Sequence, residues 1–351
     1  MSTNMIDGQK LLFHPARVAE WMGQGDCFPI YIEIGLTSRC NHRCIFCALD
    51  WLERGAVDFD REVMLKALKD MAACGVKSLM FAGEGESLLH KDAPLFIQSA
   101  SDLGIKVAVT TNGVPFTPAK AAECLPHLSW IRFSFNAGTP EQYALVHHTQ
   151  ASDFDRVLDN IRFAAEFKKK NRLKVDIGVQ ILLLPESIDG VLKLAELVKA
   201  AGADNLQVKP YSQHPSSTNR FILDYERYLD LEPQLKAFES ESFTVFFRKN
   251  TIRRIVDGVD YDTCHGLPFF ALINAKGQIM PCNLFYTNPD FIYGDLHQAN
   301  FAEIWRGEQR QHVLAAMRAR DIKDCRQACR LDPINRYLHR IKHPEERDVF
   351  I

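Results

Sequence analysis

Three cysteines stand within eight residues, in a Cys-x3-Cys-x2-Cys arrangement formed by Cys40, Cys44 and Cys47. They follow an apolar alternating run that is typical of a β-strand. Cysteine thiolate is the soft ligand that iron–sulfur centres use, so three closely spaced thiolates can hold three irons of a [4Fe–4S] cube. A structural zinc site normally takes four ligands, and an odd trio of cysteines does not pair off as disulfides. The spacing therefore indicates a cluster whose fourth iron has no protein ligand.

A second group of four cysteines lies beyond residue 260 and consists of Cys264, Cys282, Cys325 and Cys329. Four thiolates can ligate all four irons of a second cube, which leaves no iron open to another ligand. Electron transfer is then the chemistry left for that cluster. A structural zinc site takes the same four ligands and stays open as the alternative.

The three remaining cysteines are Cys27, Cys74 and Cys124. Cys27 precedes the first predicted strand, and the other two end predicted helices, so all three fall away from the C-terminal ends of the strands. We expect them to be buried structural thiols.

Between residues 30 and 210, short apolar runs alternate with longer helical patterns, which favours a parallel sheet with crossover helices. The predicted strands cover residues 30–36, 77–82, 105–111, 130–135, 174–184 and 205–209. The predicted helices cover residues 61–73, 93–101, 118–124, 154–169 and 191–201, followed beyond residue 260 by a hairpin over 267–280 and short helices at 301–306 and 311–319. Six strand–helix units are too few for a closed eight-fold barrel, so the expected fold is α/β, a partial (β/α)6 TIM-like barrel with a small C-terminal iron–sulfur domain.

The first cysteine motif and its position after a strand resemble the radical S-adenosylmethionine (SAM) superfamily, which has this partial barrel. The resemblance implies that the open iron chelates the amino and carboxylate groups of SAM. It further implies that one electron cleaves SAM to methionine and a 5′-deoxyadenosyl radical, which abstracts hydrogen from a substrate. Phe46, directly before the third cysteine, stands where the family keeps an aromatic residue near the adenine.

The loops after the predicted strands are where a barrel-type enzyme builds its site. After the second strand comes Gly83-Glu84-Gly85-Glu86, which is similar to the family's GGE motif. In the family, the backbone and the acid of that motif contact the SAM ammonium. Glu84 replaces the second family glycine, so the acid is either Glu84 or Glu86.

Five further residues match family positions that contact SAM. Asn112 follows the third strand, and Ser134 and Asn136 end the fourth, where the family reaches the ribose and carboxylate of SAM. Gln180 and Leu182 fall on the fifth strand, near where the family packs the adenine. Each residue taken singly also fits an ordinary turn or strand position. Their occurrence after successive strands favours a SAM site.

The second cysteine group, with Gly277 between its first two members, resembles the start of the SPASM domain, which adds auxiliary iron–sulfur clusters to radical SAM barrels. Four cysteines match its shortened "twitch" version with one cluster. The expected cofactors are therefore SAM and two [4Fe–4S] clusters. The predicted parts are an N-terminal extension (1–28), the radical SAM barrel (29–215), a linker or helical segment (216–258), the twitch domain (259–335) and a C-terminal tail (336–351).

The chain length and single-cluster tail resemble most the aminocyclitol (2-deoxy-scyllo-inosamine) dehydrogenase branch. We therefore expect a radical SAM oxidoreductase that oxidises a secondary alcohol of a small sugar-like or aminocyclitol substrate, with the second cluster as electron acceptor. A redox-neutral sugar epimerase or dehydratase stays open, although an epimerase would need a hydrogen donor such as a free thiol at the barrel mouth, where none is predicted. A peptide-modifying enzyme also stays open, although 39 residues before Cys40 are too few for an N-terminal peptide-recognition domain plus the first strand.

The loop at residues 209–214 follows the sixth strand and is predicted to face the substrate. Lys209, Tyr211 and His214 supply a cation, a phenol and an imidazole, which suit polar recognition and general-base catalysis. Lysine becomes a base if desolvation lowers its pKa, whereas histidine is already near neutrality. An ordinary polar loop is the alternative.

The bulk composition is that of a globular protein, with 351 residues, 46% hydrophobic, 25% charged and a net charge of −2. This charge predicts no nucleic-acid or membrane partner, and we find no apolar run long enough to span a bilayer. Ten cysteines without an export signal predict a cytoplasmic location. The expected partners are a small polar substrate and an external one-electron reductant such as flavodoxin or ferredoxin.

Overall fold

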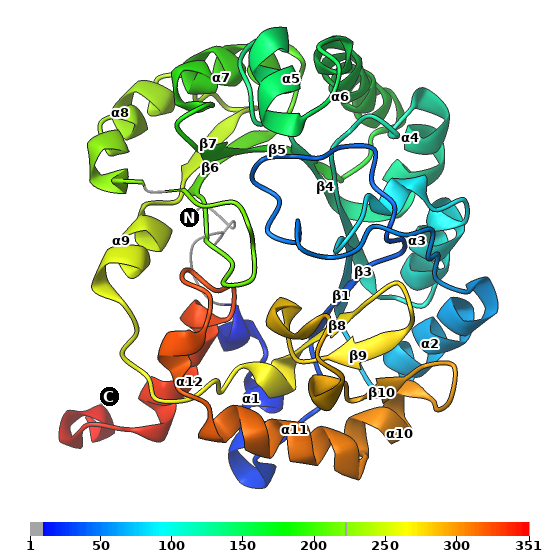
Figure 1. The fold of residues 1–351 in the computed structure, drawn as a ribbon, viewed down its shortest axis with the longest axis vertical. Helices are drawn as coiled ribbons and strands as arrows, with labels where there is room; N and C mark the ends of the chain where they lie inside the picture. The colour runs from blue at the N-terminus through cyan, green and yellow to red at the C-terminus, as the bar shows by residue number, and fades with distance from the viewer. Residues whose placement is uncertain (1–9, 222, 351) are drawn as a thin grey trace.

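The computed structural model of this chain describes residues 10–221 and 223–350. Its strands form a ten-stranded sheet in the order β10-β9-β8-β1-β2-β3-β4-β5-β6-β7. Figure 1 shows the sheet curving around the centre of the molecule, with helices along its outside. All neighbours from β8 to β7 are parallel, and β9 and β10 are antiparallel additions at one edge. This arrangement confirms the predicted α/β class with a parallel, barrel-like sheet.

The strands are short, as is usual for barrels. They are β1 (Tyr31–Ile34), β2 (Ser78–Phe81), β3 (Lys106–Thr111), β4 (Leu128–Ser134), β5 (Asp176–Leu183), β6 (Asn205–Pro210), β7 (Thr244–Phe247), β8 (Phe270–Ile273), β9 (Gln278–Met280) and β10 (Gly294–Asp295).

The helices are α1 (Pro15–Gln24), α2 (Arg61–Ala73), α3 (Ala93–Asp102), α4 (Pro118–Cys124), α5 (Pro140–His147), α6 (Ser152–Asn171), α7 (Val191–Ala200), α8 (Leu231–Lys236), α9 (Lys249–Asp257), α10 (Phe301–Arg306), α11 (Glu308–Ala319) and α12 (Asp332–Lys342). The six predicted barrel strands and five predicted barrel helices are all present, with ends that differ by at most two residues.

Among the elements that were not predicted are β7 and α5. β7 is a four-residue strand in the segment expected to be a linker or helical, and it pairs in parallel with β6. α5 has eight residues, and its start is a local signal that we overlooked: Thr139 accepts a hydrogen bond from Gln142 N at 3.2 Å, and Pro140 follows as the first helical residue. Short elements carry too little periodicity to stand out in a sequence.

The predicted hairpin over residues 267–280 forms from β8 and β9, but it is also part of the barrel sheet. β8 pairs in parallel with β1, residue for residue from Tyr31–Phe270 to Ile34–Ile273. The C-terminal cysteine segment is therefore joined to the barrel by backbone hydrogen bonds.

The two faces of the parallel strands have different roles. On β5, alternate residues point outward and are fully buried under the helices: Ile177, Val179, Ile181 and Leu183. Between them, Gln180 faces the inside of the barrel and lines a cavity there. The apolar layer lies outside the sheet, so the inside can hold polar groups.

Within residues 10–221 and 223–350, no helix has both the length and the apolar character needed to cross a bilayer.

A buried ion pair joins the segment before β1 to the C-terminal helices. Arg310 of α11 has no exposed surface and donates to both carboxylate oxygens of Asp26, at 2.6 and 2.7 Å. Trp305 Nε1 also donates to Cys27 O at 2.8 Å. Burial alone would raise the pKa of Asp26, but hydrogen bonding and the charge of Arg310 outweigh it and lower the pKa.

We predict that Asp26→Ala lowers the free energy of unfolding by about 3 to 5 kcal/mol, because it leaves a buried guanidinium without its partner. Denaturant-induced unfolding of the anaerobic holoprotein measures the change. Because the pKa of Asp26 is lowered by folding, its contribution is full above the unfolded-state pKa of about 3.9 and is lost as the pH falls through the folded pKa.

The matched control is Asp159→Ala, which removes an exposed carboxylate paired with Arg162 on α6. An exposed pair contributes at most about 1 kcal/mol. Equal losses in the two variants would contradict the assigned role of Asp26.

Candidate active site

The first cysteine group lies on the long loop between β1 and α2. Burial raises the pKa of the Cys44 thiol well above its usual value, and the charges of Cys40 and Cys47 raise it further, which indicates that the three thiols are neighbours. Arg54 Nη2 donates to Cys47 Sγ at 3.1 Å. Neighbouring buried thiols ionise only if positive charge compensates them, so this group fits a metal cluster.

The second cysteine group comes together from three places in the C-terminal segment. Burial raises the pKa of the Cys282 thiol well above its usual value, and the charges of Cys329, Cys264 and Cys325 raise it further. The four thiols are therefore close together. Two donors point at their sulfurs: Leu331 N lies 3.4 Å from Cys329 Sγ, and Asn335 Nδ2 lies 3.5 Å from Cys264 Sγ. All ten cysteines are free thiols. The donor set fits a four-thiolate cluster with N–H···S bonds to it.

The acidic loop after β2 is anchored by both of its carboxylates. Glu86 accepts hydrogen bonds from Leu88 N at 3.2 Å, Thr111 Oγ1 at 2.8 Å and Asn112 N at 2.7 Å. Glu84 accepts from Ala275 N at 2.7 Å in the β8–β9 turn. Burial raises the pKa of both carboxyls.

Gly85 in the same loop has no room for a side chain. A Cβ there would lie 2.2 Å from the carbonyl oxygen of Thr37, at the start of the cysteine loop. The two loops are therefore packed backbone to backbone.

Several residues predicted to contact SAM adjoin the first cysteine loop. Asn112 Nδ2 donates to Asn41 Oδ1 at 2.7 Å, and Asn136 Oδ1 accepts from Leu182 N at 2.8 Å. Leu182 belongs to an apolar cluster against which Phe46 packs. Gly83, Phe46 and Gln180 line the central cavity. Ser134 pairs with Gln180 across β4 and β5.

The three residues predicted to face the substrate are placed differently from one another. Lys209 lines the central cavity, and burial, followed by three nearby arginines, lowers its pKa to about 7. Tyr211 is 4% exposed, packs on Phe221 with ring centroids 5.0 Å apart, and is not among the residues lining the cavity.

His214 does not face the cavity, contrary to our expectation for a base. It has no exposed surface, and its ring lies 5.4 Å from that of Trp51. Its Nδ1 accepts from Ser216 N at 3.1 Å, so Nε2 carries the proton and donates to Asn283 O at 3.3 Å. With both nitrogens engaged, His214 joins its loop to the C-terminal segment.

The central cavity has a volume of about 590 Å³ and lies between the two cysteine groups. Cys47 of the first group and Cys282 and Cys329 of the second all line it, together with Lys209. The two cysteine groups therefore open onto the same cavity.

Several charged residues in the cavity wall were missed by sequence reasoning. They are Glu33 of β1, Arg132 of β4, Arg248 after β7, and Arg326 and Arg330 around Cys329. Arg132 could have been recognised from the sequence. It stands two residues before Ser134 and therefore shares the same face of β4. Arg248 had no such signal, because β7 was not predicted.

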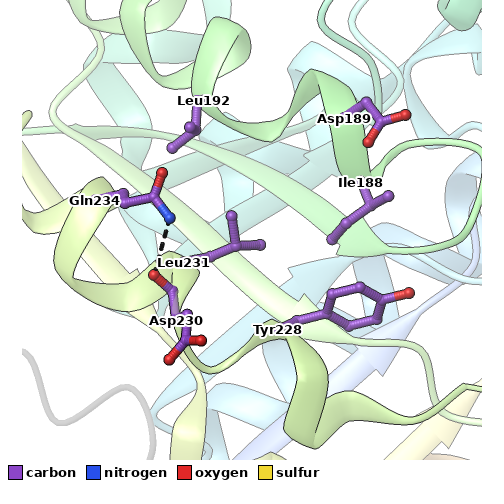
Figure 2. A pocket seen from close by; sticks show the side chains of 7 residues that line it. All are labelled: Ile188, Asp189, Leu192, Tyr228, Asp230, Leu231 and Gln234. Atoms are coloured by element: carbon purple, nitrogen blue, oxygen red, sulfur yellow. Dashed lines mark hydrogen bonds between the residues drawn. The ribbon is translucent and has the colours of Figure 1, made fainter.

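A smaller cavity of about 350 Å³ lies where α7 begins, beside α8 (Figure 2). It is lined by Ile188, Asp189, Leu192, Tyr228, Asp230, Leu231 and Gln234, and Gln234 Nε2 donates to Asp230 O at 3.1 Å. None of these residues is a predicted site residue, and none lines the central cavity.

His147 at the end of α5 donates to a cysteine of the first group. Its Nε2 lies 3.2 Å from Asn136 N, which is always a donor, so Nε2 is the acceptor. The proton of the neutral ring is then on Nδ1, 3.4 Å from Cys44 Sγ. Burial lowers the pKa of His147 well below its usual value, which keeps the ring neutral.

Both of the segments that contain the cysteine groups match known protein families. Residues 34–198 match the radical SAM superfamily, and residues 264–330 match SPASM, an iron–sulfur cluster-binding domain.

The chain is also distantly similar to known proteins. A tungsten-containing aldehyde ferredoxin oxidoreductase cofactor-modifying protein of Pyrococcus furiosus is 23% identical over 304 residues, covering 80% of this chain and 81% of that protein. A probable GTP 3′,8-cyclase of Methanothermobacter thermautotrophicus is 25% identical over 272 residues, covering 72% and 84%. The crystal structure of Streptococcus suis SuiB bound to S-adenosylmethionine has a TM-score of 0.68 at 16% identity, covering 88% of this chain and 72% of SuiB, which shows a shared fold.

We predict that His147→Phe, which keeps a ring beside Tyr143, makes the reduction potential of the first cluster more negative by about 40 mV. The reason is that the variant loses one N–H···S bond, worth about 1 kcal/mol in a one-electron couple. A redox titration followed by electron paramagnetic resonance, with the SAM-sensitive signal assigned to the first cluster, measures the shift.

The matched control is His90→Phe, since His90 is an equally buried histidine whose ring nitrogens contact backbone atoms of Phe59 and Asp92. It should leave the potential unchanged. The same potential in both variants would show that His147 only fills space.

Proposed function

This chain is a radical SAM enzyme with a SPASM domain, and from that premise we propose that it oxidises a secondary alcohol of a small, polar, sugar-like or aminocyclitol substrate. When bound, SAM and the two [4Fe–4S] clusters supply a hydrogen-abstracting 5′-deoxyadenosyl radical and an acceptor for the second electron. The residues proposed to hold the clusters are Cys40, Cys44 and Cys47 for the first, and Cys264, Cys282, Cys325 and Cys329 for the second.

The observation that carries this proposal is the single cavity shared by the two cysteine groups. Cys47 lies on one side of it and Cys282 and Cys329 on another. A redox-neutral reaction gives no reason for a fully ligated cluster to adjoin the substrate. Net oxidation gives such a reason, because an electron must leave the substrate once hydrogen has been removed.

Lys209 is the proposed proton acceptor. Oxidation of an alcohol removes the hydroxyl proton, and a base is most effective when its pKa is close to the working pH. The pKa of Lys209 is lowered to about 7, first by burial and then by the charges of Arg248, Arg326 and Arg132. Tyr211 and His214 do not line the cavity, so we assign them to the support of the loop.

The proposed SAM contacts are residues of the first cysteine loop and of the ends of β2 to β5: Phe46, Gly83, Glu84, Gly85, Glu86, Asn112, Ser134, Asn136, Gln180 and Leu182. Of the two acids, Glu86 lies next to the first cysteine group, since its backbone N donates to Arg39 O at 2.8 Å, whereas Glu84 accepts from Ala275 N in the β8–β9 turn. We therefore propose Glu86 as the acid for the SAM ammonium, with Glu84 joining the loop to the C-terminal segment. A one-electron reductant such as flavodoxin or ferredoxin would start the reaction.

The test of oxidation is a balance of products in anaerobic reactions with a panel of aminocyclitols and sugars. We expect a product with two hydrogens fewer than its substrate and one 5′-deoxyadenosine per product. Cys282→Ala should stop product formation while 5′-deoxyadenosine still forms, because the substrate radical loses its electron acceptor. Cys74→Ala is the matched control, since Cys74 lines neither cavity, and should change neither yield. A product of unchanged mass, or one lacking water, would replace oxidation by epimerisation or dehydration.

We predict that Lys209→Gln lowers the rate of product formation by about 100-fold or more, the usual contribution of a positioned base. In the wild-type enzyme the rate should rise with pH to a plateau above about 7, where the amine is unprotonated. Lys193→Gln on the surface of α7 is the control and should keep the wild-type rate. A wild-type rate in Lys209→Gln would make this loop a scaffold.

A further inference from the structure

Three side chains with metal-binding atoms meet away from the central cavity, where the segment before β8 contacts α12. They are Asp262, His265 and His339. One carboxylate oxygen and two imidazole nitrogens, one atom from each residue, all lie within 4.8 Å of one another. None of the three residues lines the central cavity, so this group is separate from the site described above.

The carboxylate oxygen is equally far from the two rings. Asp262 Oδ1 lies 3.7 Å from His265 Nε2 and 3.7 Å from His339 Nδ1. Both distances are longer than a hydrogen bond. Two ligand atoms on a tetrahedral zinc ion, each bonded at about 2.0 to 2.1 Å, lie about 3.4 Å apart. The spacing therefore fits an ion between these atoms better than direct hydrogen bonds.

Both imidazole nitrogens are buried without a hydrogen-bond partner in the described parts of the chain. The His265 side chain is almost fully enclosed, with 7% of the residue exposed. A buried polar atom that loses water and gains no partner costs free energy, and each such group calls for an explanation. A metal ion bound to the lone pair of each nitrogen would supply the missing partner.

Aromatic packing holds the two rings in place. The His265 ring lies edge-on to Trp21 of α1, with ring centroids 6.0 Å apart, and 5.8 Å from the ring of His339. His343 packs on His339 at 4.1 Å, with its Nδ1 engaged by His339 O at 2.9 Å. The Lys342 ammonium lies over the Trp21 ring, 5.0 Å from its centroid, in a cation–π contact. The two orphaned nitrogens are thus oriented before any ligand arrives.

We propose that Asp262, His265 and His339 bind a divalent transition-metal ion of the zinc type, with water in the fourth position. Imidazole nitrogen and carboxylate oxygen are ligands that zinc accepts in tetrahedral sites. The side chain of Asp262 is 73% exposed, so solvent reaches the ion from that side. Calcium and magnesium prefer oxygen ligands alone, and two imidazoles therefore disfavour them.

The position of the ion gives it a structural role next to the second cysteine group. His339 belongs to α12, and the same helix carries Asn335, whose Nδ2 lies 3.5 Å from Cys264 Sγ. Asn335 Oδ1 also accepts from Gly266 N at 2.7 Å. A metal ion joining His265 to His339 would hold α12 against the segment that carries Cys264. This role does not depend on the reaction proposed above.

Zinc binding measured without turnover tests the site. The anaerobic holoprotein, with both clusters assembled, is titrated with zinc chloride by calorimetry in the absence of SAM and reductant. We expect one zinc ion per chain and an unchanged iron content. Zinc K-edge X-ray absorption should show nitrogen and oxygen ligands at about 2.0 to 2.1 Å and no sulfur at about 2.3 Å. No zinc binding, or zinc with sulfur ligands taken from the cysteine groups, would overturn the proposal.

The variants are Asp262→Asn, His265→Gln and His339→Gln, each expected to weaken zinc binding at least 10-fold. Asp262→Asn is the safest for folding, because the carboxylate is exposed. The matched control is His312→Gln on the exposed face of α11, which should bind zinc as the wild type does. Wild-type zinc affinity in both Asp262→Asn and His339→Gln, or an equal loss in His312→Gln, would contradict the assigned ligands.

Hydrogen exchange tests the structural role separately. Zinc should slow amide exchange in α12 of the wild type and leave it unchanged in Asp262→Asn, because the ion joins this helix to the segment before β8. Unchanged exchange in zinc-loaded wild type would show that the ion does not hold α12.

Discussion

Backbone hydrogen bonding between β1 and β8 is the contact on which the rest of the site depends. β1 leads into the loop that carries Cys40, Cys44 and Cys47, and β8 leads through β9 to Cys282. The pairing joins both cysteine groups to one sheet, and the Glu84–Ala275 hydrogen bond strengthens the connection. A slip of one residue in a strand turns every side chain to the opposite face, so this register also decides which residues face the cavity. The two clusters are thereby held at a set separation by the sheet itself.

The barrel separates apolar packing from charge. Outward-facing strand residues form the buried layer under the helices, which supplies most of the stabilisation on folding. The interior instead holds Glu33, Arg132, Lys209 and several further arginines around a cavity. Charges are costly in such a space, and natural proteins keep such costs mainly at functional sites. The same low dielectric surroundings lower the pKa of Lys209 to about 7.

The loop after β6 shows how tertiary contacts divide the roles of adjacent residues. Lys209, Tyr211 and His214 are all chemically suited to a substrate site. Lys209 is the penultimate residue of β6 and lines the cavity, whereas Tyr211 packs into the apolar cluster that contains Leu182. His214 is engaged by Asn283, which is 69 residues away in the chain. The histidine thus serves the attachment of the C-terminal segment to the barrel, a role that its residue type did not suggest.

The sequence by itself determined the elements whose information is local. The spacing of Cys40, Cys44 and Cys47 specifies a ligand set through the chemistry of thiolates, and the alternation of apolar runs with helical periods specified six strands and five helices of the barrel. Those patterns depend on neighbours within a few residues. Only the tertiary structure decided that β8 joins β1, that β7 extends the sheet, and that Arg132, Arg248 and Arg326 meet around Lys209. These features depend on the register of strands far apart in the chain, and a charge that converges with others across such distances leaves no local pattern to recognise.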